Sequence, residues 1–261
     1  MQSNPRDIFS WIFFAGLMMI TALPLLNLPP WFSPPDWGKT MVFQPVFLIL
    51  LFLFLAKILL DKNNSLLSLV SAKISPMANV IALPFFLLIS LLGIFLLATL
   101  FSLDSTFSFW GDPYRAGGFL NFALYIILAI FSFLALRSSQ WEILWNYIFL
   151  ISIPISLIAI FQQFAIFSSI FVPRQEQIPS TLGGPWALGM YLILVSFLVL
   201  ALGIGAKQLP KKLLYLAVFA FFAYTIFLTV SQAAYLGFGA GIVYFFFFYP
   251  QKLKLLKILA G

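Results

Sequence analysis

The sequence predicts an all-α integral membrane protein: a polytopic transmembrane helix bundle of about eight spans with both termini in the cytoplasm. Of the 261 residues, 63% are hydrophobic and only 8% are charged, whereas soluble proteins carry about 25% charged residues. The apolar residues come in runs close to the ~20 residues that one helical span requires. Basic residues are concentrated in alternate connections between these runs, as expected when positive charges stay on the cytoplasmic side.

The apolar runs and their breaks place the predicted helices in order along the chain. The ranges are 8–28, 41–60, 79–101, 117–136, 141–167 and 186–206. The stretch 213–249 carries no charge and is too long for one span, so we divide it near its most polar point, 229–232. The first run is long and no small-residue cleavage site follows it, which favours an uncleaved anchor over a signal peptide. Runs such as FLILLFLFLAKILL do not alternate apolar and polar residues, which argues against spanning strands.

The basic residues give the orientation of the bundle. With the N-terminus inside, the cytoplasmic segments hold Arg6, Lys57, Lys62, Lys73, Arg137, Lys207, Lys211, Lys212, Lys252, Lys254 and Lys257. The outer loops hold only Lys39, Arg115 and Arg174. This bias predicts cytoplasmic termini and a multi-pass protein. The net charge of +7 therefore reflects topology and anionic lipid headgroups, and it does not call for a nucleic-acid partner.

The composition also excludes several kinds of chemistry. The chain contains no Cys and no His, which excludes disulfides, thiolate or His-based metal sites, Cys nucleophiles and a Ser-His-Asp triad. We therefore expect no metal and no cofactor. No Asp, Glu, Lys or Arg lies in the middle of a proposed span. Ion-coupled carriers usually need such groups inside the membrane, so this absence argues against a pump or a proton-coupled transporter.

The second outer loop, SLDSTFSFWGDPYRAGG, holds the first group of candidate residues. Asp112 followed by Pro is a turn signal, and the two glycines after Ala116 permit an unusual backbone before the next helix. Arg115 stands beside Tyr114 at the predicted membrane surface. Arg binds phosphate through two parallel hydrogen bonds, so this segment is a candidate clamp on a lipid-linked phosphate. The alternative is an interfacial anchor within an aromatic belt.

The third outer loop and the 229–232 turn hold the second group. Arg174 precedes the segment STLGGP, which runs from Ser180 through Thr181 to Pro185. Pro185 fits the first turn of a helix whose N-terminal amides can meet an anion. The alternative is a helix cap with a solvated ion pair between Arg174 and Glu176. The hydroxyls and amide of 229–232, ending in Gln232, can contact a sugar or diphosphate, or they can satisfy the backbone of a tight turn near lipid.

A further motif in the last predicted helix concerns packing. The segment GFGAG contains the spacing GxxxG between Gly237 and Gly241. In a membrane this spacing lets two helix backbones approach closely. No strand precedes it, so we interpret it as a packing motif and not as a dinucleotide fingerprint.

Three segments in order give the chain a family resemblance. They are SFWGDPYRAGGFLNFALYIILA, STLGGPWALGMYLILV and LTVSQAAYLGFGAGI. Together they resemble the O-antigen ligase and O-antigen polymerase superfamily of bacterial membrane glycosyltransferases. The resemblance implies one integral membrane domain over 1–261, with a five-helix N-terminal part at 1–168 and the start of the ligase-like core at 180–249. It also implies localisation in the bacterial inner membrane.

The resemblance further implies an activity and a set of binding residues. Family members transfer a glycan from undecaprenyl diphosphate to lipid A-core, to another glycan or to protein at the outer face of the inner membrane, without metal or nucleotide sugar. Arg115 and Arg174 are then expected to hold the diphosphate. Tyr114, Asp112 and Thr181 are expected to shape the site. Gln232 stands where the family often has Arg.

One departure leaves the enzyme question open. A His in a large outer loop is usually assigned as the family's base, and this chain has no His. The chain is therefore expected to be the N-terminal part of a family member or a shortened one. The alternative from another functional class is a non-enzymatic carrier or flippase, or a scaffold subunit of an envelope polysaccharide system.

Overall fold

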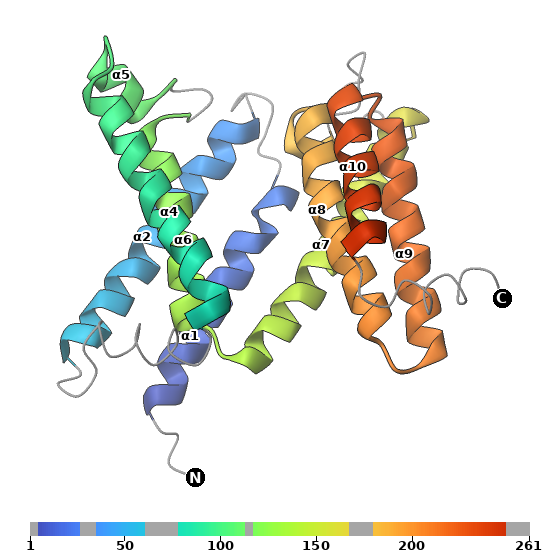
Figure 1. Cartoon of the computed structure of the whole chain (residues 1–261), viewed down its shortest axis with the longest axis horizontal. Helices are drawn as coiled ribbons and strands as arrows, with labels where there is room; N and C mark the ends of the chain where they lie inside the picture. Colours follow the sequence, from blue (N-terminus) through green and yellow to red (C-terminus); the bar gives the residue numbers. More distant parts are fainter. Residues whose placement is uncertain (1–4, 27–34, 61–77, 113–116, 167–179, 249–261) are drawn as a thin grey trace. The chain divides into compact units, whose positions relative to one another are not determined.

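The computed structural model describes residues 5–26, 35–60, 78–112, 117–166 and 180–248. Within these ranges all regular secondary structure is helical, which confirms the predicted class (Figure 1). Five helices are long and apolar enough to cross a membrane. Three more apolar helices are shorter and cover 9–25, 119–135 and 232–248. The helices thus indicate a multi-pass membrane protein, while the count of eight spans and the cytoplasmic termini stay predictions.

The chain separates into two compact units, Met1–Tyr147 and Ile148–Gly261. The described helices of unit 1 are α1 (Pro5–Ala22), the 3-10 turn η1 (Leu23–Leu25), α2 (Pro35–Leu60), α4 (Ala78–Leu100), α5 (Ser105–Trp110) and α6 (Phe119–Ala135). Those of unit 2 are η3 (Ser180–Leu182), α8 (Pro185–Gly205), α9 (Leu209–Leu228) and α10 (Gln232–Phe248). Helix α7 (Ser138–Gln163) begins in unit 1 and ends in unit 2. The single domain at 1–261 stays a prediction.

Prolines define several helix starts and are also tolerated inside helices. Pro5, Pro35 and Pro185 are the first residues of α1, α2 and α8. At this position the missing N–H costs nothing, because the first turn has no carbonyl to bond it. Pro185 thereby confirms the predicted start of α8. Prolines also lie inside α2, α4 and α7, as membrane helices permit when neighbouring groups satisfy the freed carbonyl.

The core of unit 1 is aromatic. Phe131 of α6 meets the rings of Phe13 from α1 and of Phe47 and Phe54 from α2, with ring centroids 5.1–5.7 Å apart and nearly perpendicular planes. Phe13, Phe47 and Phe131 are at most 2% exposed. Edge-to-face pairs add about 0.5–1.5 kcal/mol each beyond burial. Helix α4 differs, since only 6% of its apolar 83–100 window is buried, as expected of a helix that faces lipid.

Two polar links join helices within this apolar core. The Nε2 of Gln44 in α2 donates to the Oδ1 of Asn121 in α6 at 2.8 Å. Near the other end of α6, the Nε2 of Gln140 donates to the hydroxyl of Ser10 at 3.1 Å. Asn121, Gln140 and Ser10 are all buried. Hydrogen bonds of this kind restrict how far one helix can slide along another.

Unit 2 is built on close packing between α8 and its neighbours. A Cβ placed on Gly189 of α8 would lie 2.5 Å from the Cβ of Ala234 in α10. A Cβ on Gly237 would lie 3.3 Å from Ile193, and one on Gly241 would overlap the ring of Phe197. The residues of the GxxxG spacing therefore face α8, which confirms the packing interpretation.

One predicted boundary, the start of α2, was wrong, and two short elements were missed. Helix α2 begins at Pro35, six residues before the predicted 41, because Gly38 and Lys39 continue the helix. The segment 105–110 forms α5, where a loop was expected, because the carboxylate of Asp104 accepts the N–H of Phe107 at 2.8 Å and caps the helix. The missed η3 begins at Ser180. The division of 213–249 near 229–232 is confirmed by the end of α9 and the start of α10.

Candidate functional site

A contact between two glycines organises the predicted second outer loop. Gly111 has a positive φ of 76°, which other residues adopt only with strain. A Cβ on Gly118 would overlap the backbone nitrogen of Gly111 and the carbonyl carbon of Trp110. A Cβ on Gly111 would in turn overlap the backbone nitrogen of Gly118. Only glycine fits at these two positions, and their contact holds residues 112 and 117 close to the ends of α5 and α6.

Short polar bonds fix α5 against the end of α4. The hydroxyls of Ser102 and Ser108 lie 2.6 Å apart, and either can donate. Thr99, one turn earlier in α4, donates its hydroxyl to the carbonyl of Phe95 at 2.8 Å. With the Asp104 cap, the bond between Ser102 and Ser108 holds α5 against the segment that follows α4.

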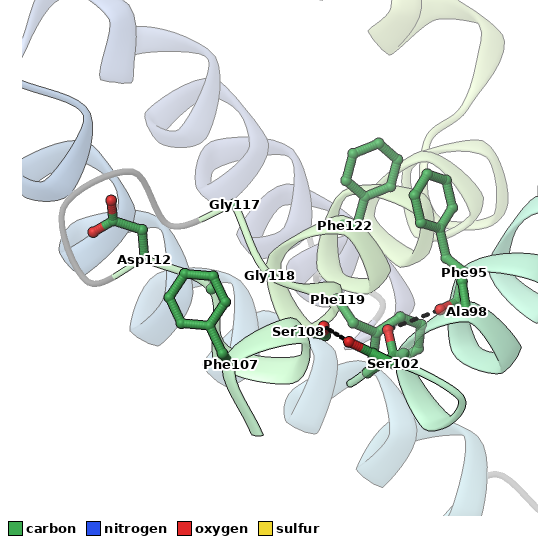
Figure 2. Close-up of a pocket in the computed structure, with 12 residues that line it drawn as sticks. Phe95, Ala98, Ser102, Phe107, Ser108, Asp112, Gly117, Gly118, Phe119 and Phe122 are labelled. Atoms are coloured by element: carbon green, nitrogen blue, oxygen red, sulfur yellow. Dashed lines mark hydrogen bonds between the residues drawn. The ribbon is translucent and has the colours of Figure 1, made fainter. Parts of the chain in front are cut away.

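A pocket of about 580 Å³ lies between the ends of α4, α5 and α6. Figure 2 shows Phe95 and Phe122 at one end of the pocket and Asp112 at the other. The two rings are 4.4 Å apart between centroids. The pocket lining also contains Ser102, Ser108, Phe107 and Phe119. One end is therefore aromatic, with the hydroxyls of Ser102 and Ser108 close to it, while the carboxylate of Asp112 lies at the other end.

The structure describes three of the six candidate binding residues. Asp112 lines the pocket of unit 1 and is partly buried. Thr181 is 4% exposed in η3, and Gln232 is the exposed first residue of α10. Tyr114, Arg115 and Arg174 lie outside the described residues. Whether any of the six contacts a substrate stays a prediction.

In unit 2, the turn between α9 and α10 uses its polar side chains locally. The hydroxyl of Thr229, which is fully buried, donates to the carbonyl of Ile226 at 2.7 Å. The N–H of Ser231 lies 3.4 Å from the hydroxyl of Thr229, and the N–H of Ala234 lies 3.4 Å from the hydroxyl of Ser231. These contacts stabilise a turn that contains Val230 at a positive φ of 52°. Gln232 follows directly, with its side chain exposed.

The segment before α8 is anchored to α7 through Ser180. Ser180 donates its N–H to the Oε1 of Gln162 at 2.8 Å and its hydroxyl to the carbonyl of Ile155 at 2.7 Å. These two bonds hold Ser180 at a positive φ of 49°. Gly184 is the N-cap of α8 and supplies no side-chain cap. The first amides of α8 therefore have no side-chain acceptor at that position.

Neither metal chemistry nor known relatives define the site. Among the described residues, no group of three or more Asp, Glu, His or Cys side chains is arranged to hold a metal ion. Comparisons of the chain with family models, with curated proteins and with solved structures found no match.

Sequence reasoning missed the hydroxyls that line the pocket. Ser102 and Ser108 lie within the quoted loop, but nothing in their spacing marks them as partners, because their contact depends on α5. The Asp104 cap could have revealed α5, since Asp before a short apolar stretch is a helix-start signal. Phe95 and Phe122 look like lipid-facing residues in the sequence, and only the crossing of α4 and α6 brings them into one pocket.

Proposed function

We propose that this chain is an O-antigen ligase-like glycosyltransferase of the bacterial inner membrane. In this proposal it moves a glycan from undecaprenyl diphosphate to lipid A-core, to another glycan or to protein at the outer face. It crosses the membrane about eight times with both termini in the cytoplasm. Arg115 and Arg174 hold the diphosphate, while Tyr114, Asp112, Thr181 and Gln232 shape the site.

The pocket at the ends of α4, α5 and α6 carries this proposal. It lies where the charge bias puts the outer membrane surface. Its aromatic rings suit an isoprenoid chain, while the carboxylate of Asp112 and the hydroxyls of Ser102 and Ser108 suit polar headgroup atoms. The chain places Arg115 between Asp112 and Gly117, two residues that line this pocket. A lipid-linked sugar diphosphate has this combination of an apolar tail and a strongly polar head.

The proposal is tested by binding and by transfer with the purified chain in nanodiscs. The ligand is an undecaprenyl diphosphate-linked glycan, and the readouts are its affinity and the appearance of glycan on lipid A-core, on a second glycan or on a protein acceptor. Arg115→Ala is expected to weaken binding by about 1.5–3 kcal/mol, about ten- to hundredfold, because a charged hydrogen bond is lost. Arg137→Ala is the matched control, since Arg137 is an exposed arginine on the predicted cytoplasmic side.

The outcomes separate the enzyme from its alternatives. If Arg115→Ala and Arg137→Ala lose the same amount of binding affinity, or if neither loses any, Arg115 is not part of the site. Carrier binding that depends on Arg115, without transfer to any acceptor, contradicts the glycosyltransferase and supports a carrier or scaffold. No binding to the wild-type chain overturns the proposal altogether.

A further inference from the structure

The place where η3 meets α7 fixes the orientation of a buried amide. Ser180 is 3% exposed and donates its N–H to the Oε1 of Gln162 at 2.8 Å. Only the oxygen of an amide side chain can accept from an N–H, so this bond also decides where the nitrogen lies. The Nε2 of Gln162, a donor of two hydrogen bonds, must face away from the backbone of Ser180.

Two polar atoms near this contact are buried and have no hydrogen-bond partner among the described residues. They are the Nε2 of Gln162 and the hydroxyl oxygen of Ser156. Gln162 is 6% exposed and Ser156 is 0% exposed. A buried donor without an acceptor loses its hydration and receives nothing in exchange, which is why such atoms are uncommon in folded proteins. Two within two turns of one helix require an explanation.

Ser180 connects the surroundings of the two atoms. Its hydroxyl donates to the carbonyl of Ile155 at 2.7 Å, and Ile155 directly precedes Ser156 in the chain. Side chains in a helix lean towards its N-terminus, so the amide of Gln162 leans along α7 over the turn that precedes it. Ser180 thus contacts α7 at Gln162 itself and at the residue that precedes Ser156.

The local charge limits what can satisfy these atoms. Residues 148–166 and 180–206 contain no Asp, Glu, Lys or Arg. An ion bound among them would be buried without a countercharge from these segments, which is very costly. An uncharged oxygen accepts a hydrogen bond from the amide and exchanges one with the hydroxyl at no such cost.

We infer that unit 2 contains a binding site for uncharged hydroxyl oxygens where η3 meets α7, with one position at Gln162 Nε2 and one at Ser156 Oγ. The oxygens belong either to water molecules held in the unit or to the hydroxyls of a sugar. Buried waters of this kind typically make about three hydrogen bonds to groups that would otherwise be unsatisfied. This site is separate from the pocket of unit 1, and it does not depend on the proposed transfer of a glycan.

The direction in which Ser156→Ala shifts the midpoint of thermal unfolding tests the inference. Ser156→Ala removes the hydroxyl and changes the volume little. Without a bound oxygen, the variant loses only an unsatisfied group and its midpoint of thermal unfolding stays equal or rises. With a bound oxygen, the midpoint falls by about 2–4 °C. Ser196→Ala is the matched control, because Ser196 is 0% exposed in the same unit and its hydroxyl donates to the carbonyl of Leu192 in its own helix at 2.6 Å.

Measurements with and without a sugar distinguish water from a sugar hydroxyl as the source of the oxygen. Both variants and the wild-type chain are measured in a sugar-free zwitterionic detergent, with and without saturating methyl glucoside. A fall specific to Ser156→Ala in the absence of sugar identifies water, and a fall that occurs only with methyl glucoside identifies a sugar hydroxyl. A midpoint equal to or above that of Ser196→Ala in both conditions overturns the inference.

A density map of the wild-type chain in nanodiscs checks the result directly. Under the inference, density that does not belong to the protein lies within hydrogen-bonding distance of Gln162 Nε2 and Ser156 Oγ, about 2.7–3.2 Å. A side chain of the protein in that position overturns the inference even if Ser156→Ala is destabilising.

Discussion

Gly111 and Gly118 lie in backbone contact, although seven positions separate them in the chain. The overlap that a side chain would cause involves main-chain atoms on both sides. Neighbouring rotamers therefore cannot relieve it, and the backbone itself would have to move. Since both glycines line the pocket between α4, α5 and α6, its shape depends on this contact.

Gly118→Ala is therefore expected to destabilise unit 1 by about 1–3 kcal/mol, the usual effect of an overpacked site. The measurement is the midpoint of thermal unfolding in detergent. Gly117→Ala provides the matched control, since a Cβ there meets nothing within 4 Å. Equal midpoints for the two variants would show that the two backbone segments are not in contact.

The hydrogen bond between Gln44 and Asn121 gives a second prediction. Gln44→Leu removes the donor to Asn121 Oδ1 and is expected to cost about 0.6 kcal/mol and at most about 1.7 kcal/mol, the mean and the maximum found for bonds between membrane helices. The double variant with Asn121→Leu should recover part of this loss, because it removes both polar groups. A double-mutant cycle of unfolding free energies measures the coupling, and a coupling of zero would contradict the bond.

The packing of α8 against α10 gives a third prediction. Gly189→Ala brings a Cβ to 2.5 Å from that of Ala234, so we expect a loss of about 1–3 kcal/mol. Adding Ala234→Gly should restore much of it. Gly239→Ala in α10, where nothing lies within 4 Å, should leave stability unchanged or slightly raise it, because alanine favours helix. Equal effects at Gly189 and Gly239 would be inconsistent with this packing.

The absence of cysteine in the sequence makes the orientation directly testable. Thr106→Cys and Gln208→Cys introduce single thiols at exposed positions on opposite sides of the predicted bundle. In intact spheroplasts, a membrane-impermeant maleimide should label the first variant and should label the second only after lysis. The reverse pattern would mean that the N-terminus lies outside and that the charge bias misled the assignment.

The sequence located the long helices because their apolar runs are interrupted by groups that lipid does not tolerate. The Thr229–Gln232 break is an example, since Thr229 and Ser231 bond the backbone of the turn between α9 and α10. The prediction from sequence failed where a helix starts among polar residues. Pro35 begins α2 before Gly38 and Lys39, and Asp104 caps the six-residue α5. These starts depend on local backbone bonds, and hydropathy does not detect them.

The candidate site was predictable only in part, for a related reason. Asp112 stands out in the sequence as an acid at a turn, and it does line the pocket. Gln162 does not stand out, since its importance depends on the N–H of Ser180, 18 residues later. Periodicity describes which face of a helix is apolar. It does not show which two polar groups form a contact between helices. The pocket and the buried amide both depend on contacts of that kind.

The bond between Gln44 and Asn121 has a consequence for biosynthesis, because 77 residues separate its partners. During translation, α2 leaves the ribosome well before α6 is made. Until Asn121 arrives, the amide of Gln44 has to find water or another protein group, since an unsatisfied amide in lipid is costly. Helix α2 is therefore expected to remain beside the translocation machinery until α6 enters the membrane, so that the two helices leave for the bilayer together.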